Sequence, residues 1–408
     1  MPANSWGCHP EPAQAGEASA FEKLLLRLSA PSGGARPFLS RTTAPGSSST
    51  SHVYSVTRLF ADTSVHCHDK RRPAIPSYNL AIVGFGNVGR ALLRLLISKE
   101  MELRRKYDVR WRLTGVATRR IGWLANPDGL NPIAAISGHF PTGLQPARDV
   151  YEWLERARAD VLFEATSLNA PTGQPAIEHL IAALKHGAHA VTANKGPIVH
   201  AYRELTTLAR ERGRQFLFES TVMDGAPIFS LFPLALPAAE LRGFSGVLNS
   251  TTNVVLTEVE KGRSFDEAIK RAQAMGVAET DPSQDLDGWD SAVKVAAIAT
   301  VLMGVPTRVD QVQRTGIREL SEEKIRSVRA AGMRYKLVCR AALRGDGVDC
   351  RVSPELLLLS DPLAGLEGTS SAIRFDLDVF GLSLVEHNPG VEATAYGLLA
   401  DFLRAAKA

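Results

Sequence analysis

The sequence has few cysteines and no long apolar run. Its four cysteines, Cys8, Cys67, Cys339 and Cys350, show no Cys-x-x-Cys spacing. This pattern favours neither a zinc site nor a disulfide framework. No apolar run approaches the ~20 residues that a membrane-spanning helix requires. We therefore expect a soluble, cytoplasmic protein with no membrane partner.

A large excess of basic charge is also absent from most of the chain. The net charge is +4, but residues 1–76 alone hold eight Lys/Arg against five Asp/Glu. The remainder is close to neutral, so we expect no nucleic-acid partner. With 408 residues and 45% hydrophobic content, the chain is long enough for two domains with sizeable cores.

Residues 1–76 lack sustained hydrophobic periodicity and are rich in Ser, Ala, Pro and Arg. This composition predicts a disordered leader. An organelle transit peptide is one interpretation, although Glu11, Glu17 and Glu22 argue against it. A start codon assigned too far upstream is the other, and the folded protein would then begin near Pro76.

A glycine pattern follows the first apolar run, Leu80–Val83. Three glycines have the G-x-G-x-x-G spacing, and an apolar helical pattern comes after them. In such turns the first glycine permits the tight bend, the second lets a pyrophosphate approach, and the third lets the helix pack closely. The sequence therefore predicts a dinucleotide-binding turn at Gly84, Phe85, Gly86, Asn87, Val88 and Gly89.

An acidic residue is missing where the second predicted strand, Val109–Ala117, ends. NAD sites place a carboxylate there for the ribose 2′-hydroxyl, whereas this chain has Thr118, Arg119 and Arg120. Arginines suit a 2′-phosphate, so the sequence favours NADP, with NAD possible. The alternative interpretation is a solvated basic loop.

Strand and helix patterns alternate from residue 77 to residue 218, which predicts an α/β fold with a Rossmann-type, doubly wound parallel sheet. Within it, residues 121–158 are predicted to contain an irregular connection and a helix near Val150–Ala157. Ligands bind at the carboxyl ends of such strands, where Thr166, Ser167 and Lys195 lie. Residues 219–387 are expected to form a second, α+β catalytic and dimerisation domain, and the helix in 388–408 to complete the first.

A stretch rich in acids, residues 276–294, precedes an apolar helical pattern. Asp290 and Lys294 are four residues apart, so they share one face of that helix. Such a pair is usually a solvated surface ion pair. Here the apolar flank predicts burial, and a buried lysine can have a perturbed pKa and donate a proton.

Several motifs together resemble homoserine dehydrogenase, over essentially all of residues 77–408. The matching stretches are the glycine turn, Ala193-Asn194-Lys195, Glu219–Ile228, Asn249-Ser250-Thr251-Thr252-Asn253, Glu279-Thr280-Asp281-Pro282 and Asp285–Lys294. The last is the most specific of them. The resemblance is to members without a kinase domain or a C-terminal regulatory domain.

The resemblance implies NAD(P)-dependent, reversible reduction of L-aspartate 4-semialdehyde to L-homoserine, in threonine and methionine biosynthesis. It implies that Lys294 donates a proton to the nascent alkoxide, that Asp290 orients it, and that Lys195 is a second candidate proton carrier next to the nicotinamide. The implied substrate-binding residues are Glu279, which would hold the ammonium group, Thr251, near the carboxylate, and Asp285.

The resemblance further implies a monovalent cation such as Na⁺, bound mostly through backbone carbonyls at Glu219, Val222, Asp224 and Ala226. It also implies a homodimer paired through the smaller sheet. The chain departs from the family at Met223-Asp224 and at Ser250, where glycine is common.

Two alternative functions stay open from the residues alone. Another Rossmann NAD(P) oxidoreductase acting on an amino-acid-like substrate would keep the glycine turn without needing the Asp290 and Lys294 pair. A non-catalytic NADP(H) sensor would bind the nucleotide yet tolerate the loss of Lys294.

Overall fold

The computed structural model describes residues 75–407. The predictions made for residues 1–76 therefore fall, except for the last two positions, outside the described residues. In the range from 75 to 407, no helix is both long enough and apolar enough to cross a membrane.

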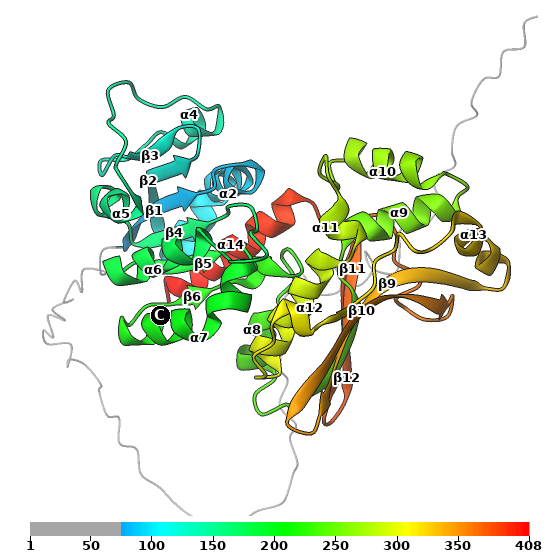
Figure 1. The fold of residues 1–408 in the computed structure, drawn as a ribbon. Helices are drawn as coiled ribbons and strands as arrows, with labels where there is room; N and C mark the ends of the chain where they lie inside the picture. Colours follow the sequence, from blue (N-terminus) through cyan, green and yellow to red (C-terminus); the bar gives the residue numbers. More distant parts are fainter. Residues whose placement is uncertain (1–74, 408) are drawn as a thin grey trace, which may run out of the picture. The chain divides into compact units, whose positions relative to one another are not determined.

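The first sheet has six strands in the order β3-β2-β1-β4-β5-β6 (Figure 1). The central strand β1 pairs in parallel with β2 on one side and β4 on the other, so the chain winds outward in both directions. This confirms the predicted doubly wound sheet. Its strands are β1 (Ser77–Val83), β2 (Arg110–Thr118), β3 (Gly122–Ala125), β4 (Val161–Glu164), β5 (His189–Thr192) and β6 (Phe216–Leu217).

Helices cover this sheet and bury its apolar strands. Along the chain they are α2 (Asn87–Ser98), α3 (Glu100–Lys106), α4 (Pro132–Ile136), α5 (Val150–Ala157), α6 (Ala176–His186) and α7 (Gly196–Glu211). The last helix of the chain, α14 (Val391–Ala405), returns to pack against α2 (Figure 1). Its Phe402 is fully buried and meets the rings of Tyr78 and Phe163 edge-on.

The segment 121–158 is more regular than the sequence predicts. Strand β3 pairs antiparallel with β2, and helix α4 begins at Asn131, whose side chain caps it. The predicted helix at Val150–Ala157 is confirmed, but the prediction of an irregular connection before it was wrong. The reason is that β3 is a four-residue strand whose place depends on pairing and on the contact between Trp123 and Trp153, with centroids 5.2 Å apart. Both are tertiary interactions that local periodicity does not report.

The second sheet also has six strands, in the order β12-β11-β7-β9-β10-β8. Its pairs are antiparallel except for β8 with β10. The two edge strands, β8 and β12, are short and partly exposed. The strands are β7 (Leu241–Val247), β8 (Gln313–Arg314), β9 (Met333–Arg344), β10 (Gly347–Leu358), β11 (Ser371–Leu377) and β12 (Gly381–Glu386).

The helices beside the second sheet carry the site residues. They are α8 (Ile228–Ala235), α9 (Ser250–Glu260), α10 (Phe265–Ala274), α11 (Ser283–Leu286), α12 (Trp289–Leu302) and α13 (Glu322–Ala330), with 3-10 turns η1 (Glu219–Thr221) and η2 (Val309–Gln311). Helix α12 is buried along most of its length and packs against α7 from the first sheet. This contact brings residues of both sheets to one place.

Candidate active site

The glycine turn has the geometry that a dinucleotide phosphate requires. Gly84 has a φ of +81°, and a Cβ there would lie 2.4 Å from the backbone of Ala165. A Cβ on Gly86 would meet nothing within 4 Å, so the space beside this residue is open. No side chain caps the N-terminus of α2, which leaves its first N–H groups available to an anion. The turn therefore fits a pyrophosphate.

The two arginines predicted to contact a 2′-phosphate lie in the turn between β2 and β3. Arg119 and Arg120 are both exposed. The Thr118 hydroxyl accepts a hydrogen bond from the Ile121 N–H at 3.2 Å and so stabilises this turn. The guanidinium groups are free to meet an anion at the strand end.

A buried carboxylate organises the ends of β4 and β5. Glu164 is fully buried and accepts hydrogen bonds from the Thr166 N–H at 3.0 Å and the Thr192 hydroxyl at 2.9 Å. Asn194 donates to the carbonyls of Thr166, at 3.1 Å, and Ser167, at 3.3 Å. The two strand ends are thereby joined. Sequence reasoning did not identify Glu164 as part of the site, because its partners come from the neighbouring strand.

Asn194 also fixes the residue that follows it. Its side-chain oxygen accepts a hydrogen bond from the Gly196 N–H at 2.9 Å, at the start of α7. Lys195 occupies the N-cap position of this helix. The backbone of Lys195 is thus held from both sides, and its side chain extends toward α12.

Two lysines converge on one carboxylate. The Lys195 Nζ lies 3.0 Å from Asp290 Oδ1, and the Lys294 Nζ lies 3.5 Å from Asp290 Oδ2. The Lys294 ammonium also donates to the Leu248 carbonyl at 2.5 Å. The three charged side chains are only 14–18% exposed. We refer to Lys195, Asp290 and Lys294 as the lysine–aspartate cluster.

Asn249 links this cluster to helix α9. Its side-chain nitrogen donates to Asp285 Oδ1 at 2.6 Å and to Asp290 Oδ2 at 3.1 Å. Its side-chain oxygen accepts a hydrogen bond from the Thr252 N–H at 2.9 Å and caps α9. The contacts with Asp285 and Asp290 have no local sequence signal, since both residues lie far along the chain from Asn249.

The charges of the cluster set its protonation. Burial acts to raise the pKa of Asp290, but Lys195 and Lys294 outweigh it, and the pKa lies well below its ordinary value. Burial acts to lower the pKa of Lys294, but Asp290 and Asp224 outweigh it and raise the pKa. Burial and the Asp290 charge raise the pKa of Asp285. At neutral pH the cluster therefore holds an aspartate anion and a protonated Lys294.

The three predicted substrate-binding residues differ in burial and in their contacts with the rest of the site. Thr251 is buried and donates to the Val277 carbonyl at 3.2 Å. Asp285 is half-buried and bonded to Asn249, next to the cluster. Glu279 is exposed, and in the described part of the chain its carboxylate makes no hydrogen bond. The structure thus brings Asp285 to the cluster but not the Glu279 carboxylate.

The four residues predicted to hold a cation surround the turn η1. The Glu219 carboxylate is buried and accepts hydrogen bonds from the Phe229 and Ser230 N–H groups, at 2.6 and 2.9 Å, so it caps α8. Between residues 75 and 407, the Val222 and Asp224 carbonyls accept no hydrogen bond, whereas the Ala226 carbonyl accepts one from the Ile228 N–H. These two carbonyl oxygens are thus without a hydrogen-bond donor among the described residues.

These features restrict the class of protein. The glycine turn can hold the pyrophosphate of a dinucleotide, and the lysine–aspartate cluster can give a proton to an oxygen that gains negative charge when hydride reaches a carbonyl carbon. The protein is an NAD(P)-dependent oxidoreductase.

Comparison with known proteins identifies the family. The sequence model described as "Homoserine dehydrogenase, NAD binding domain" matches residues 84–219, and the one described as "Homoserine dehydrogenase" matches residues 227–403. The chain is 35% identical over 337 residues to an NAD(+)-dependent homoserine dehydrogenase of Pseudomonas canavaninivorans, covering 80% of this chain and 95% of that protein. The chain belongs to the homoserine dehydrogenase family.

Solved structures agree with this assignment. A putative homoserine dehydrogenase from Archaeoglobus fulgidus superposes with a TM-score of 0.69 at 30% identity, covering 80% of this chain and 98% of that one. A hyperthermophilic archaeal homoserine dehydrogenase in complex with NADPH superposes with a TM-score of 0.69 at 28% identity, covering 81% of this chain and 98% of that one.

Two alanine substitutions in the glycine turn should have opposite effects. Gly84→Ala should lower the free energy of unfolding by about 2–5 kcal/mol, because a Cβ would collide with the Ala165 backbone at a left-handed φ. Gly86→Ala should leave that free energy within about 0.5 kcal/mol. It should nevertheless weaken dinucleotide binding roughly tenfold or more, because the methyl group would occupy the space a pyrophosphate needs.

Urea unfolding and fluorescence titration with NADPH would measure the two effects. Full NADPH affinity in a folded Gly86→Ala variant would contradict a pyrophosphate at this turn.

Proposed function

We propose that this chain catalyses the NADP-dependent, reversible reduction of L-aspartate 4-semialdehyde to L-homoserine through the lysine–aspartate cluster. The observation that carries the proposal is the convergence of Lys195 and Lys294 on Asp290 beside the carboxyl edge of the first sheet. The reaction is that of the family to which the chain belongs.

A nucleotide held at the glycine turn would supply hydride for the aldehyde carbon, and residues of this chain would supply the proton. As negative charge develops on the aldehyde oxygen, the Lys294 ammonium gives it a proton and yields the alcohol. The raised pKa of Lys294 keeps this acid protonated at neutral pH. Asp290 holds the ammonium in place and balances its charge in a nearly closed site. Lys195, on the other Asp290 oxygen, is the alternative proton carrier.

The substrate's two polar ends require partners of opposite charge. We assign the carboxylate end to the first turn of α9 near Thr251, and the ammonium group to the acids Asp285 and Glu279. Asp285 lies beside the cluster, so it is positioned to act on bound substrate directly. Glu279 can act only if its exposed side chain turns toward the substrate.

Lys294→Ala should abolish turnover while leaving nucleotide binding intact. Removal of a general acid costs roughly 10²–10⁴-fold in kcat. The NADPH Kd should not change, because Lys294 lies on α12 and the glycine turn lies at the edge of the first sheet. The kcat is measured by following NADPH oxidation by absorbance in the presence of aspartate 4-semialdehyde. The NADPH Kd is measured by fluorescence titration.

Lys270→Ala is the matched control, since Lys270 is an exposed lysine on α10. Unchanged turnover in Lys294→Ala would remove Lys294 from the mechanism. A wild-type chain that binds NADPH but does not turn over the semialdehyde would favour the sensor or another substrate.

We propose NADP as the preferred cofactor because of Arg119 and Arg120. Similar proteins differ in what their names record: one is described as NAD(+)-dependent and another was solved with NADPH. The two exposed guanidinium groups at the end of β2 match the charge of a 2′-phosphate.

The double variant Arg119→Ala/Arg120→Ala should therefore raise the KM for NADPH roughly tenfold or more and leave the KM for NADH within about twofold. Loss of a charged contact to the 2′-phosphate affects only the phosphorylated nucleotide. Arg104→Ala/Arg105→Ala, exposed arginines on α3, controls for general charge. Equal losses with both nucleotides would refute the phosphate assignment.

We propose that a monovalent cation such as Na⁺ binds the backbone carbonyls of Val222 and Asp224, with Glu219 and Ala226 completing the loop. Support comes from the two carbonyl oxygens without hydrogen bonds. Replacing Na⁺ with a bulky organic cation such as choline at constant ionic strength should lower turnover or thermal stability. Identical turnover and melting temperature in both salts would exclude the site.

We propose that the chain forms two domains, the first made of residues 77–218 together with 388–408 and the second of residues 219–387. We further propose that the second domain forms the interface of a homodimer. An open face of the second sheet carries arginines and aspartates that suit a second copy of the same face: Arg340, Asp349, Arg351, Arg374 and Asp376. Arg374→Glu should convert a dimer to a monomer in light scattering, because like charges would oppose each other across the interface. A wild-type chain that is already monomeric would overturn this assignment.

A further inference from the structure

The segment 364–370, between β10 and β11, is held by side chains through its backbone carbonyls. From β9, Arg334 donates to the Ala364 carbonyl at 2.9 Å and Lys336 donates to the Leu366 carbonyl. From α9, Asn253 donates to the carbonyls of Gly368, at 3.0 Å, and Ser370, at 3.4 Å, and Ser250 to that of Thr369 at 3.1 Å. We call residues 364–370 the clamped segment.

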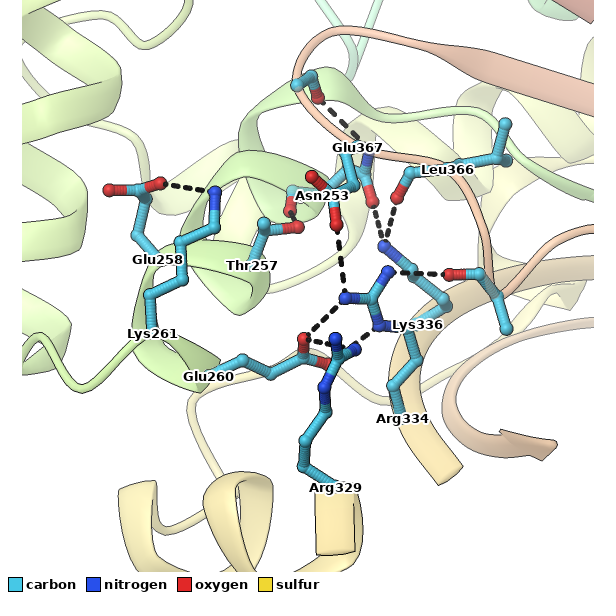
Figure 2. Close-up of polar contacts among 12 residues, drawn as sticks. Asn253, Thr257, Glu258, Glu260, Lys261, Arg329, Arg334, Lys336, Leu366 and Glu367 are labelled. Carbon is cyan, nitrogen blue, oxygen red and sulfur yellow. Dashed lines mark hydrogen bonds and ion pairs between the residues drawn. The ribbon is translucent and has the colours of Figure 1, made fainter. Parts of the chain in front are cut away.

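Lys336 lies at the centre of this arrangement (Figure 2). Its side chain is fully buried, with 1% of its surface exposed. The Nζ donates to the Asn253 side-chain oxygen at 2.6 Å as well as to Leu366. The buried Lys336 amine thus contacts both Asn253, whose side chain holds the clamped segment, and the clamped segment itself.

The neighbouring Arg334 has a carboxylate partner, whereas Lys336 has none within ion-pair distance among the described residues. Figure 2 shows the Arg334 guanidinium against the Glu260 carboxylate, with contacts at 3.1 and 2.8 Å. Among residues 75–407, Lys336 has no carboxylate within 4 Å of its nitrogen. Burial and the nearby Arg334 charge lower the pKa of Lys336 to about 7. Burying an amine without an ionic partner is costly, so its retention in the core calls for a reason other than stability.

The contact between Lys336 and Asn253 lies one helical turn from Asn249, which bonds to the lysine–aspartate cluster. Asn253 lies on α9 four residues after Asn249, the N-cap of that helix, and Asn249 donates hydrogen bonds to both Asp285 and Asp290. Ser250, between them, is fixed to Thr369. The clamp therefore sets the rotation and depth of the α9 turn that carries Asn249 and Thr251.

The clamped segment is itself anchored to the chain that enters α14. Thr369 donates to the Pro389 carbonyl at 3.0 Å, and the Asn388 N–H donates to the Ser370 hydroxyl at 3.1 Å. The α9 turn is thus braced against residues that lead back to the first sheet, rather than against a free loop.

We propose that Lys336 is a positioning residue for the substrate site: its bonds to Asn253 and Leu366 hold the first turn of α9, and through Asn249 the carboxylates of Asp285 and Asp290, in their working positions. This rests on the proposed function, because the effect is expressed in semialdehyde reduction. Lys336 does not touch the reacting atoms; it acts through α9.

Lys336→Met tests the proposal, since methionine keeps a flexible apolar stem and removes the donor. The kcat/KM for aspartate 4-semialdehyde should fall roughly 10–100-fold, because small displacements of positioned groups have effects of that size. The NADPH Kd should stay within about twofold, since the glycine turn is not part of the clamp. Hydrogen exchange in residues 250–254 and 364–370 should accelerate in the same variant.

Asn253→Asp provides a second variant with a different lesion. It gives Lys336 an ionic partner, but it replaces the amide donor to the Gly368 and Ser370 carbonyls with an oxygen that repels them. The contact between α9 and the clamped segment is therefore lost, and the variant should show the same loss of kcat/KM and the same exchange pattern. Lys270→Met, on the exposed face of α10, is the matched control and should change none of these quantities.

A folded Lys336→Met variant with wild-type kcat/KM would overturn the proposal, even if its melting temperature fell, because a purely structural lysine would behave in that way. If Lys336→Met does not fold, Asn253→Asp decides by the same criterion. If the wild-type chain itself does not reduce the semialdehyde, the proposed function fails. In that case hydrogen exchange still tests the clamp, and unchanged protection of residues 250–254 in the variants would overturn it.

Discussion

The site depends on the carboxylate of Asp290, which is shared by two lysine ammonium groups from separate parts of the chain. Lys195 begins α7 beside the first sheet, and Lys294 lies one turn along α12 from Asp290. In a nearly closed space neither ammonium is stable without a counter-charge. Removing Asp290 would leave both cations unpaired, so this one group joins the nucleotide-binding sheet to the substrate region.

The surrounding polar groups extend this charge balance. Asn249 donates both of its side-chain N–H groups to carboxylates, one to Asp285 and one to Asp290, and so holds the two acids side by side. Burial and the charge of Asp290 make the ionised form of Asp285 less favourable and raise its pKa. Such a pair persists because the two lysines supply the compensating charge. Under the proposed assignment, a cationic substrate group approaching Asp285 would relieve the remaining repulsion.

At the glycine turn of the first sheet, the main features are backbone groups and open space rather than buried charge. The turn offers backbone N–H groups and open space around Gly86, and the exposed Arg119 and Arg120 follow the neighbouring strand β2. Both arginines sit in a surface turn with exposed side chains, so under the proposed assignment their replacement would change cofactor preference with little effect on the fold.

The sequence by itself determined the features that have a short period or a local signature. These are the doubly wound sheet, the glycine turn, and the pair of Asp290 and Lys294, since helical geometry places residues four apart on one face. Only the tertiary structure decided which distant groups meet. Lys195 reaches Asp290 because α7 packs on α12, β3 and β12 exist through pairing with their neighbours, and Lys336 reaches Asn253 across 83 positions of sequence. Such contacts carry no periodic signal, because each is fixed by packing and charge pairing between elements that are remote along the chain.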